Sequence, residues 1–234
     1  MDKNDTTRAV DYKGHLFIQM AFFTGTVILN FVLPRAMSHF GIPLYLDSVG
    51  ILLAAILGGY LPGIVVGYLN NIINMSGNPG NAYYVVLSTM IAASATYLGA
   101  RGYFKKFTKA LLTIPVFAFI GGVLGSVLTY LLYGFGMGEG ISASFARSLL
   151  ESGRLSVFWA QMTSDVAIDI VDKTITVILA YIIMKLIPDR IKPCLWLTGW
   201  RQAPLSRDAL KAVRKNTTRS FSLRGKIIAI ISII

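Results

Sequence analysis

Apolar residues fall into six long runs along the chain, separated by polar or glycine-rich connections. The runs cover residues 16–33, 45–60, 61–75, 82–100, 110–133 and 157–187. A helix needs roughly 20 predominantly apolar residues to cross a hydrocarbon core of ~30 Å. The pattern therefore predicts an all-α membrane protein, a bundle of six transmembrane helices. The first run is expected to close at Pro34, and the sixth is long enough for one end to project from the bilayer.

The second and third runs are short, and they meet at a Gly-Gly-Tyr-Leu-Pro turn. Runs this short need shielding by neighbouring helices, because backbone exposed to lipid has no water to bond. Gly59, Gly63 and Gly67 recur every four residues, a spacing that lets helices approach closely. Pro62 is expected to interrupt the helix between the first two of these glycines. The glycines at 121, 122 and 125 predict a second close-packing face in the fifth run.

A flexible connection and a short amphipathic helix are predicted between the fifth and sixth runs. The connection holds four glycines at 134–140 and lacks the Lys-Ser/Thr of a phosphate-binding loop. After it, Ile141, Phe145, Leu149 and Leu150 fall at helical spacing among serines and charges. This pattern is typical of a helix that lies at a membrane surface.

The net charge of +11 is placed unevenly and predicts the orientation in the membrane. Basic residues gather near the N-terminus, at residues 101–109 and at residues 201–226. The last of these stretches holds eight basic residues and a single acidic residue, Asp208. The positive-inside rule places both chain ends in the cytoplasm of a multi-pass plasma-membrane protein. The connections at 34–46, 76–81 and 134–156 are then extracellular. A basic tail beside a membrane domain favours anionic lipid over nucleic acid as its partner.

Composition agrees with a membrane protein and suggests four parts. Only 14% of residues are charged, against about 25% in soluble domains. Residues 1–14 are polar and balanced in charge, so they predict a cytoplasmic tail and no cleavable signal. Residues 15–187 form the membrane domain and 188–226 a basic linker. Residues 227–234 read as the start of a further transmembrane helix, or as a short hydrophobic terminus.

Four polar residues of the sixth run form one helical stripe: Gln161, Asp165, Asp169 and Asp172. Ionisable residues inside a membrane cost about 2.5–3.5 kcal/mol each on insertion scales, which makes them functional candidates. Asp169 has a structural alternative, because Lys173 follows it by four residues in the favourable order for an ion pair. Asp165 and Asp172 have no such basic partner. We expect them to face an aqueous pocket or a partner on another helix.

Further candidates lie at the outer ends of the shorter runs. Asp47 is either the N-cap of the following helix or a residue that faces the cavity. The asparagines either bond neighbouring helices or point into the site, and they are Asn70, Asn71, Asn74, Asn78 and Asn81. Tyr84, next to Tyr83, is either an aromatic of the membrane interface or a stacking surface for a flat ligand.

Catalytic, metal and cofactor signatures are missing from the sequence. His15 and His39 are far apart, and the single Cys194 excludes an internal disulfide and a multi-cysteine metal site. No nucleotide-binding loop or dinucleotide fingerprint occurs. We therefore expect neither an enzyme nor a bound metal or cofactor.

Several motifs resemble those of a known family. Leu-Asp-Ser-Val-Gly at 46–50, Leu-Ala-Ala-Ile-Leu-Gly-Gly at 53–59, Pro62-Gly63 and Gly67 look like the early helices of the S components of energy-coupling-factor (ECF) vitamin transporters. Asp-Ile-Val-Asp-Lys-Thr-Ile at 169–175 is similar to their last helix. The resemblance covers residues 15–187. It implies a six-helix domain that binds a vitamin-like small molecule from the extracellular side, with ligand-facing candidates Asn70, Asn74, Asn78, Asn81, Asp165 and Asp169.

The end of the chain departs from the transport family, whose members usually stop soon after the sixth helix. Leu-Arg-Gly-Lys at 223–226 before an apolar run resembles the membrane entry of bacterial signalling proteins with a kinase, cyclase or serine/threonine phosphatase output. The first hypothesis is therefore a sensory input domain of a larger signalling protein, with a homodimer through its C-terminal region. The alternative is a transport S component that docks on an ECF coupling module, for which Ala21 and Gly25 are a weak match.

Overall fold

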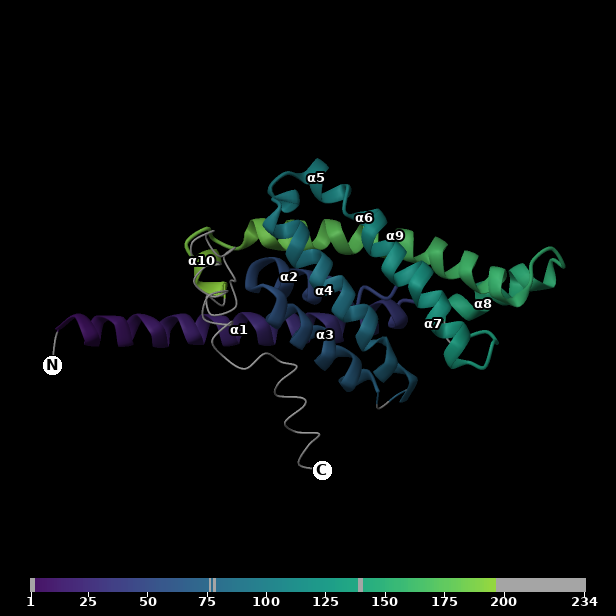
Figure 1. Ribbon diagram of the computed structural model, residues 1–234, viewed down its shortest axis with the longest axis horizontal. Helices are drawn as coiled ribbons and strands as arrows, with labels where there is room; N and C mark the ends of the chain where they lie inside the picture. Colours follow the sequence, from purple (N-terminus) through teal and green to yellow (C-terminus); the bar gives the residue numbers. More distant parts are fainter. Residues whose placement is uncertain (1–2, 76, 78, 139–140, 197–234) are drawn as a thin grey trace, which may run out of the picture. The chain divides into compact units, whose positions relative to one another are not determined.

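The computed structural model describes residues 3–75, 77, 79–138 and 141–196, and every element in this part of the chain is helical (Figure 1). The described residues belong to one compact unit that ends at Leu197. Most of the basic linker, and the further helix predicted at 227–234, lie outside the described residues. The all-α prediction is confirmed for the part of the chain that the structure describes.

The first helix, α1 (Lys3–His39), extends beyond the first apolar run at both ends. It includes residues 3–14, the predicted tail, and it continues through Pro34 for another turn. The expectation that Pro34 closes the helix is wrong. Proline removes one intrahelical hydrogen bond, and the Arg35 guanidinium donates to the carbonyl oxygen of Phe31 in this turn, at 3.0 Å.

Two short helices, α2 (Val49–Gly58) and α3 (Tyr60–Asn74), follow as predicted. They are separated at Gly59, whose φ of 101° lies in a region that residues with a side chain rarely adopt. The expected interruption at Pro62 does not occur. Pro62 stands in the first turn of α3, where a backbone N–H has no intrahelical partner to lose.

The fourth and fifth apolar runs each form a nearly continuous helical stretch. The fourth consists of the 3₁₀ turn η1 (Pro79–Tyr84) and α4 (Val85–Ala100). The short turn η2 (Tyr103–Lys105) connects it to the fifth. The fifth comprises, in order, α5 (Phe107–Leu111), α6 (Ile114–Ala118), the π-helical turn η3 (Phe119–Leu124) and α7 (Gly125–Leu132).

The last three helices are α8 (Ile141–Glu151), α9 (Val157–Leu186) and the short α10 (Lys192–Leu195). The amphipathic helix and the long sixth run are thus confirmed as helices. The face of α8 that packs inside the protein consists of small residues. Ala143 and Ala146 are buried and Phe145 is 49% exposed, because α8 packs along α9 and small residues allow the closer approach.

Helix α2 is the centre of the core. Its residues from Val49 to Ala55 are fully buried, and it packs against α1, α3, α4 and α9. A Cβ added at Gly63 would lie 2.6 Å from the Cβ of Ala55, so this glycine permits the close contact of α2 with α3. The expected shielding of this short apolar helix is confirmed, and so is close packing at Gly63.

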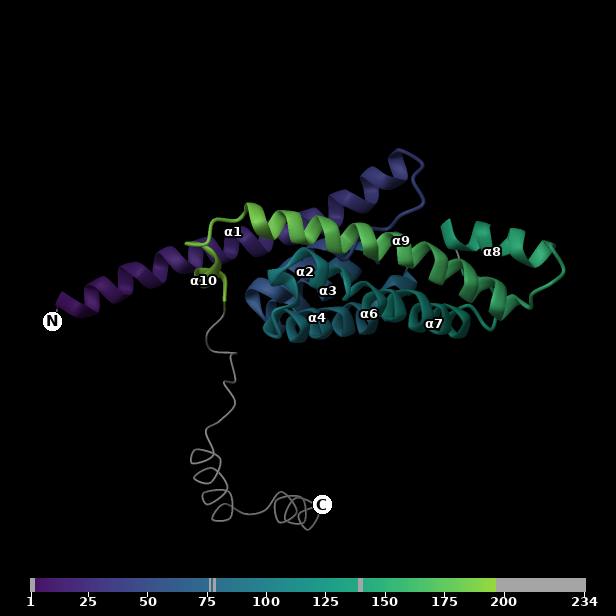
Figure 2. The same cartoon turned by 90° about the horizontal axis from the view of Figure 1, so that it is seen from above.

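The helices run back and forth between two ends of the bundle (Figures 1 and 2). We call one end the asparagine end, where η1 follows α3 and where Asn74 and Asn81 are hydrogen-bonded. Tyr84 in η1 contacts Thr129 near the end of α7 there. We call the other the lysine end, where Lys105, Lys185 and Lys192 line one cavity.

Three helical stretches among the described residues are long and apolar enough to cross a membrane: His15–His39, Pro79–Ala100 and Phe107–Leu132. Helix α2 is apolar but shorter. This composition indicates a membrane-associated protein. The remaining spans of the predicted six carry more charge or fewer residues.

Candidate functional site

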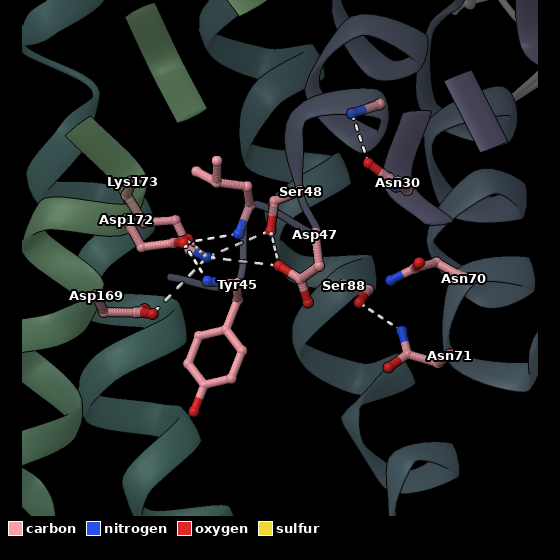
Figure 3. A network of polar contacts seen from close by, with 12 residues as sticks. Asn30, Tyr45, Asp47, Ser48, Asn70, Asn71, Ser88, Asp169, Asp172 and Lys173 are labelled. Atoms are coloured by element: carbon pink, nitrogen blue, oxygen red, sulfur yellow. Dashed lines mark hydrogen bonds and ion pairs between the residues drawn. The ribbon is translucent and has the colours of Figure 1, made fainter. Parts of the chain in front are cut away.

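The candidate site forms around a stretch of non-helical backbone, residues 42–46, that leads into α2. A buried backbone N–H without a partner is costly, most of all where no water can reach it. The N–H groups of Tyr45 and Leu46 both donate to Oδ1 of Asp172 on α9, at 2.8 and 2.7 Å (Figure 3). One carboxylate therefore anchors the irregular segment against the middle of α9.

Lys173 holds the centre of the polar network in Figure 3. Its Nζ lies 2.8 Å from Oδ2 of Asp172, 3.7 Å from Oδ1 of Asp169 and 3.8 Å from Oδ1 of Asp47. It also donates to Oγ of Ser48, at 3.3 Å. The side chain of Lys173 is only 4% exposed, so these contacts replace the water that an ammonium group would otherwise need.

Two expectations about this stripe are now decided. The ion pair of Asp169 with Lys173 is confirmed at the i,i+4 spacing. Asp172 has no basic residue four positions further on, but it pairs with the adjacent Lys173, whose flexible side chain turns back to it. Asp172 does find a partner on another element, as expected, but that partner is the backbone before α2.

Negative charge exceeds positive charge in this cluster. Three aspartates, Asp47, Asp169 and Asp172, surround Lys173, and Asp165 lies one turn before Asp169 on α9. Oδ2 of Asp165 and of Asp169 is buried and accepts no hydrogen bond from the described residues. The side chain of Asp47 is 41% exposed, which connects the cluster to the surroundings. The arrangement can therefore accept a further positive group.

Asp47 does not cap α2 as one interpretation predicted. The N-cap position belongs to Ser48, and it makes no side-chain cap hydrogen bond. Oδ1 of Asp47 accepts instead from Oγ of Ser48, at 2.9 Å. The N–H of Gly50 in the first turn donates to Oδ1 of Asn30 on α1, at 2.6 Å. Asn30 was missed by the sequence reasoning, although it is the one amide within an otherwise apolar stretch at 27–33.

The part of α9 near the asparagine end holds a second set of contacts. Nε2 of Gln161 donates to Oδ1 of Asp165 at 2.8 Å, and Oε1 of Gln161 accepts from the N–H of Gly138. The hydroxyl of Tyr45 lies 3.4 Å from that of Ser142. The connections before α2 and before α8 therefore meet beside Asp165, and Gln161, Asp169 and Asp172 share the buried face of α9.

The predicted asparagines form their own cluster at the asparagine end. Nδ2 of Asn74 donates to Oδ1 of Asn70 at 3.2 Å, and Nδ2 of Asn81 donates to the carbonyl oxygen of Asn74 at 2.9 Å. Arg35 reaches Oδ1 of Asn74 at 3.4 Å. These contacts are within or next to α3. Asn78, which was also predicted for the site, lies outside the described residues.

Asn71 and the tyrosines take different positions. Asn71 is buried and donates to Oγ of Ser88 on α4 at 2.7 Å, which is the predicted bond to a neighbouring helix (Figure 3). Tyr84 is partly buried and its hydroxyl lies 2.6 Å from Oγ1 of Thr129. Tyr83 and Trp159 are largely exposed, as aromatics of a membrane interface are. A stacking role is thus open to Tyr84 rather than to Tyr83.

The described residues form at least two cavities, and none of the predicted site residues lines either of these two. The larger, of about 550 Å³, lies between α8, α9 and the segment before α2. Its walls are mostly apolar, and they include Pro43, Leu44, Phe145, Ile168 and Val171. Leu44 and Val171 are the chain neighbours of Tyr45 and Asp172, so this cavity borders the anchored segment.

Among the described residues, no group of three or more histidine, cysteine, aspartate or glutamate side chains is arranged to hold a metal ion. Comparison with protein families, with curated proteins and with solved structures found no match to this chain.

Proposed function

We propose that this chain is a membrane-embedded domain that binds a small molecule carrying a positive charge. The observation that carries the proposal is the surplus of carboxylates around Lys173, together with the two buried oxygens of Asp165 and Asp169 that accept no hydrogen bond from the described residues. Charge buried without a partner is costly, so such a surplus is typical of a binding site. Asp47 and Asp165, which are partly exposed, would meet the ligand first.

The proposed setting is a six-span bundle with both chain ends in the cytoplasm and an arrangement like that of ECF S components. Three of the six spans are the stretches that are long and apolar enough to cross a membrane by themselves. In this arrangement α2, α3 and α9 are the other three spans. Support for the orientation comes from Lys105, Lys185 and Lys192, which gather at one end. The asparagine end is then extracellular, and the ligand enters from there.

We further propose that binding is relayed as a signal through α9. This helix carries Asp165, Asp169 and Asp172 and continues without a break to Leu186, next to the basic linker. A ligand that prefers one position of α9 would bias the segment that follows it. The domain would then be the sensory input of a larger signalling protein, and binding rather than catalysis would be its task.

A transport S component is the second candidate. Ala21 and Gly25 are both exposed on α1, and a Cβ added at Gly25 would meet no atom within 4 Å. Small residues on an open helix face allow a partner helix to approach closely. Co-purification of a coupling module with the chain from its native membrane would favour transport. Loss of that complex in Gly25→Leu would place the contact on α1.

The binding proposal is tested by thermal unfolding of the purified chain in lipid nanodiscs, with small metabolites grouped as cationic, neutral or anionic. We expect stabilisation by a cationic compound and a weaker effect in Asp165→Asn and Asp47→Asn. Asp189→Asn is the matched control, because this aspartate is exposed at the lysine end. Stabilisation that is independent of ligand charge, or that is unchanged in both site variants, would contradict the proposal.

A further inference from the structure

The smaller cavity, of about 400 Å³, lies at the lysine end. It combines apolar walls with three lysines, and these residues are Ile56, Phe104, Met184, Lys105, Lys185 and Lys192. The lysines come from three separate elements: η2, the last turn of α9 and the start of α10. Chain segments far apart in sequence therefore bring three ammonium groups to one apolar hollow.

Positive charge dominates the connections around this cavity. Residues 101–109 and 185–192 contain one acidic residue, Asp189, and seven basic residues, which are Arg101, Lys105, Lys106, Lys109, Lys185, Arg190 and Lys192. Asp189 pairs with Lys192 at 2.7 Å, but its side chain is 95% exposed. An ion pair this exposed is weak and readily exchanged. Among the described carboxylates, none lies within ion-pair distance of Lys105 or Lys185.

Helix ends explain only part of this arrangement. A lysine in the last turn of a helix interacts favourably with the helix dipole, and this accounts for Lys185. Lys105 and Lys192 belong to single turns of three and four residues, which are too short for a helix dipole to account for their positions. The dipole also does not account for the apolar walls between the three side chains.

We propose that this cavity binds the head group of an anionic phospholipid. The phosphate would be held by Lys105, Lys185 and Lys192, and the first part of the acyl chains would lie on apolar surface nearby. That surface exists, because Ile182 and Leu186 on the last turns of α9 are strongly exposed. Basic hollows between transmembrane helices at the cytoplasmic side are suited to such lipids. The site does not depend on the proposed small-molecule binding.

The test uses the full chain in detergent micelles, with native mass spectrometry and thermal unfolding as readouts. Phosphatidylglycerol, phosphatidylcholine and inorganic phosphate are the three probes. We expect phosphatidylglycerol to bind and stabilise more strongly than phosphatidylcholine, and inorganic phosphate to have little effect. Replacing all three lysines, Lys105→Gln, Lys185→Gln and Lys192→Gln, should weaken phosphatidylglycerol binding roughly a hundredfold, because each basic residue contributes to the attraction.

A matched control removes the same charge from the same connections. Lys106→Gln, Lys109→Gln and Arg190→Gln change three exposed residues that do not line the cavity, and binding should stay within about threefold. An equal loss in both triple variants would overturn the proposal, since it would show diffuse attraction. Equal binding of the two lipids, or full stabilisation by inorganic phosphate, would overturn it too. If the first triple variant does not fold, single Lys105→Gln and Lys185→Gln variants give the same comparison.

Discussion

The backbone N–H of Tyr45 lies 2.8 Å from Oδ1 of Asp172, a residue 127 positions further along the chain. This contact joins the segment before the buried helix α2 to the middle of α9. It explains how non-helical backbone persists inside an apolar bundle, because the carboxylate takes the place of the missing helical acceptors. Asp172 is therefore a structural anchor as well as a member of the charged cluster.

Asp172→Ala should loosen the segment before α2. The variant leaves the N–H groups of Tyr45 and Leu46 without an acceptor, and it removes the shortest contact of Lys173. We expect amide hydrogen exchange at residues 44–47 to become at least tenfold faster, with α4 unaffected. Hydrogen-exchange mass spectrometry measures both. Unchanged protection at 44–47 would show that the hydrogen bonds to Asp172 do not hold the segment.

Lys173→Met should destabilise the protein by about 3–5 kcal/mol, because it leaves buried carboxylates without their counter-charge. Lys109→Met is the matched control, since Lys109 is exposed on α5, and it should change the free energy of unfolding by at most about 0.5 kcal/mol. Detergent-induced unfolding followed by circular dichroism measures the two values. Adding Asp172→Asn to Lys173→Met should recover part of the loss. A cost for Lys173→Met close to that of the control would contradict the central role of this lysine.

Much of the helical framework can be read from the hydrophobic pattern. The bounds of α9 agree with the sixth run, and α2 and α3 separate next to the predicted turn. The pattern fails at Pro34, because a proline signals a missing hydrogen bond but not whether the helix tolerates it. In α8 the apolar spacing predicts the helix, but it does not identify the face packed against α9, which consists of the small residues Ala143 and Ala146.

The candidate site is harder to predict because its contacts join distant parts of the chain. The spacing of Asp169 and Lys173 predicts their ion pair, since both residues belong to one helix. No local sequence pattern predicts that Asp172 accepts a hydrogen bond from the backbone N–H of Tyr45. The same is true of the hydrogen bond that Asn30 on α1 accepts from the first turn of α2. Periodicity identifies the buried face of α9, but only the packing of other segments decides what that face meets.

Gly63→Leu should strongly weaken the contact of α2 with α3. A Cβ at Gly63 would overlap the side chain of Ala55, and overpacking of this kind costs typically about 1–3 kcal/mol. Gly25→Leu is the control, because a Cβ there meets open space, and a helical glycine replaced by leucine should leave stability unchanged or raise it slightly. Thermal unfolding of the two variants in the same detergent compares them. Equal stability of both would show that α2 and α3 do not pack as closely as described.

The single native cysteine offers a direct test of orientation. Cys194 belongs to α10 at the lysine end and is partly exposed. If that end is cytoplasmic, a membrane-impermeant maleimide should leave the native chain unlabelled in intact cells and label it after permeabilisation. Glu151→Cys in a Cys194→Ser background moves the thiol to an exposed position at the end of α8. This variant should be labelled in intact cells, because α8 and the start of α9 lie at the asparagine end. The reverse labelling of the two chains would invert the orientation and place the basic connections outside the cell. Labelling of both chains in intact cells would contradict the six-span arrangement, because the two ends of α9 would then lie on the same side of the membrane.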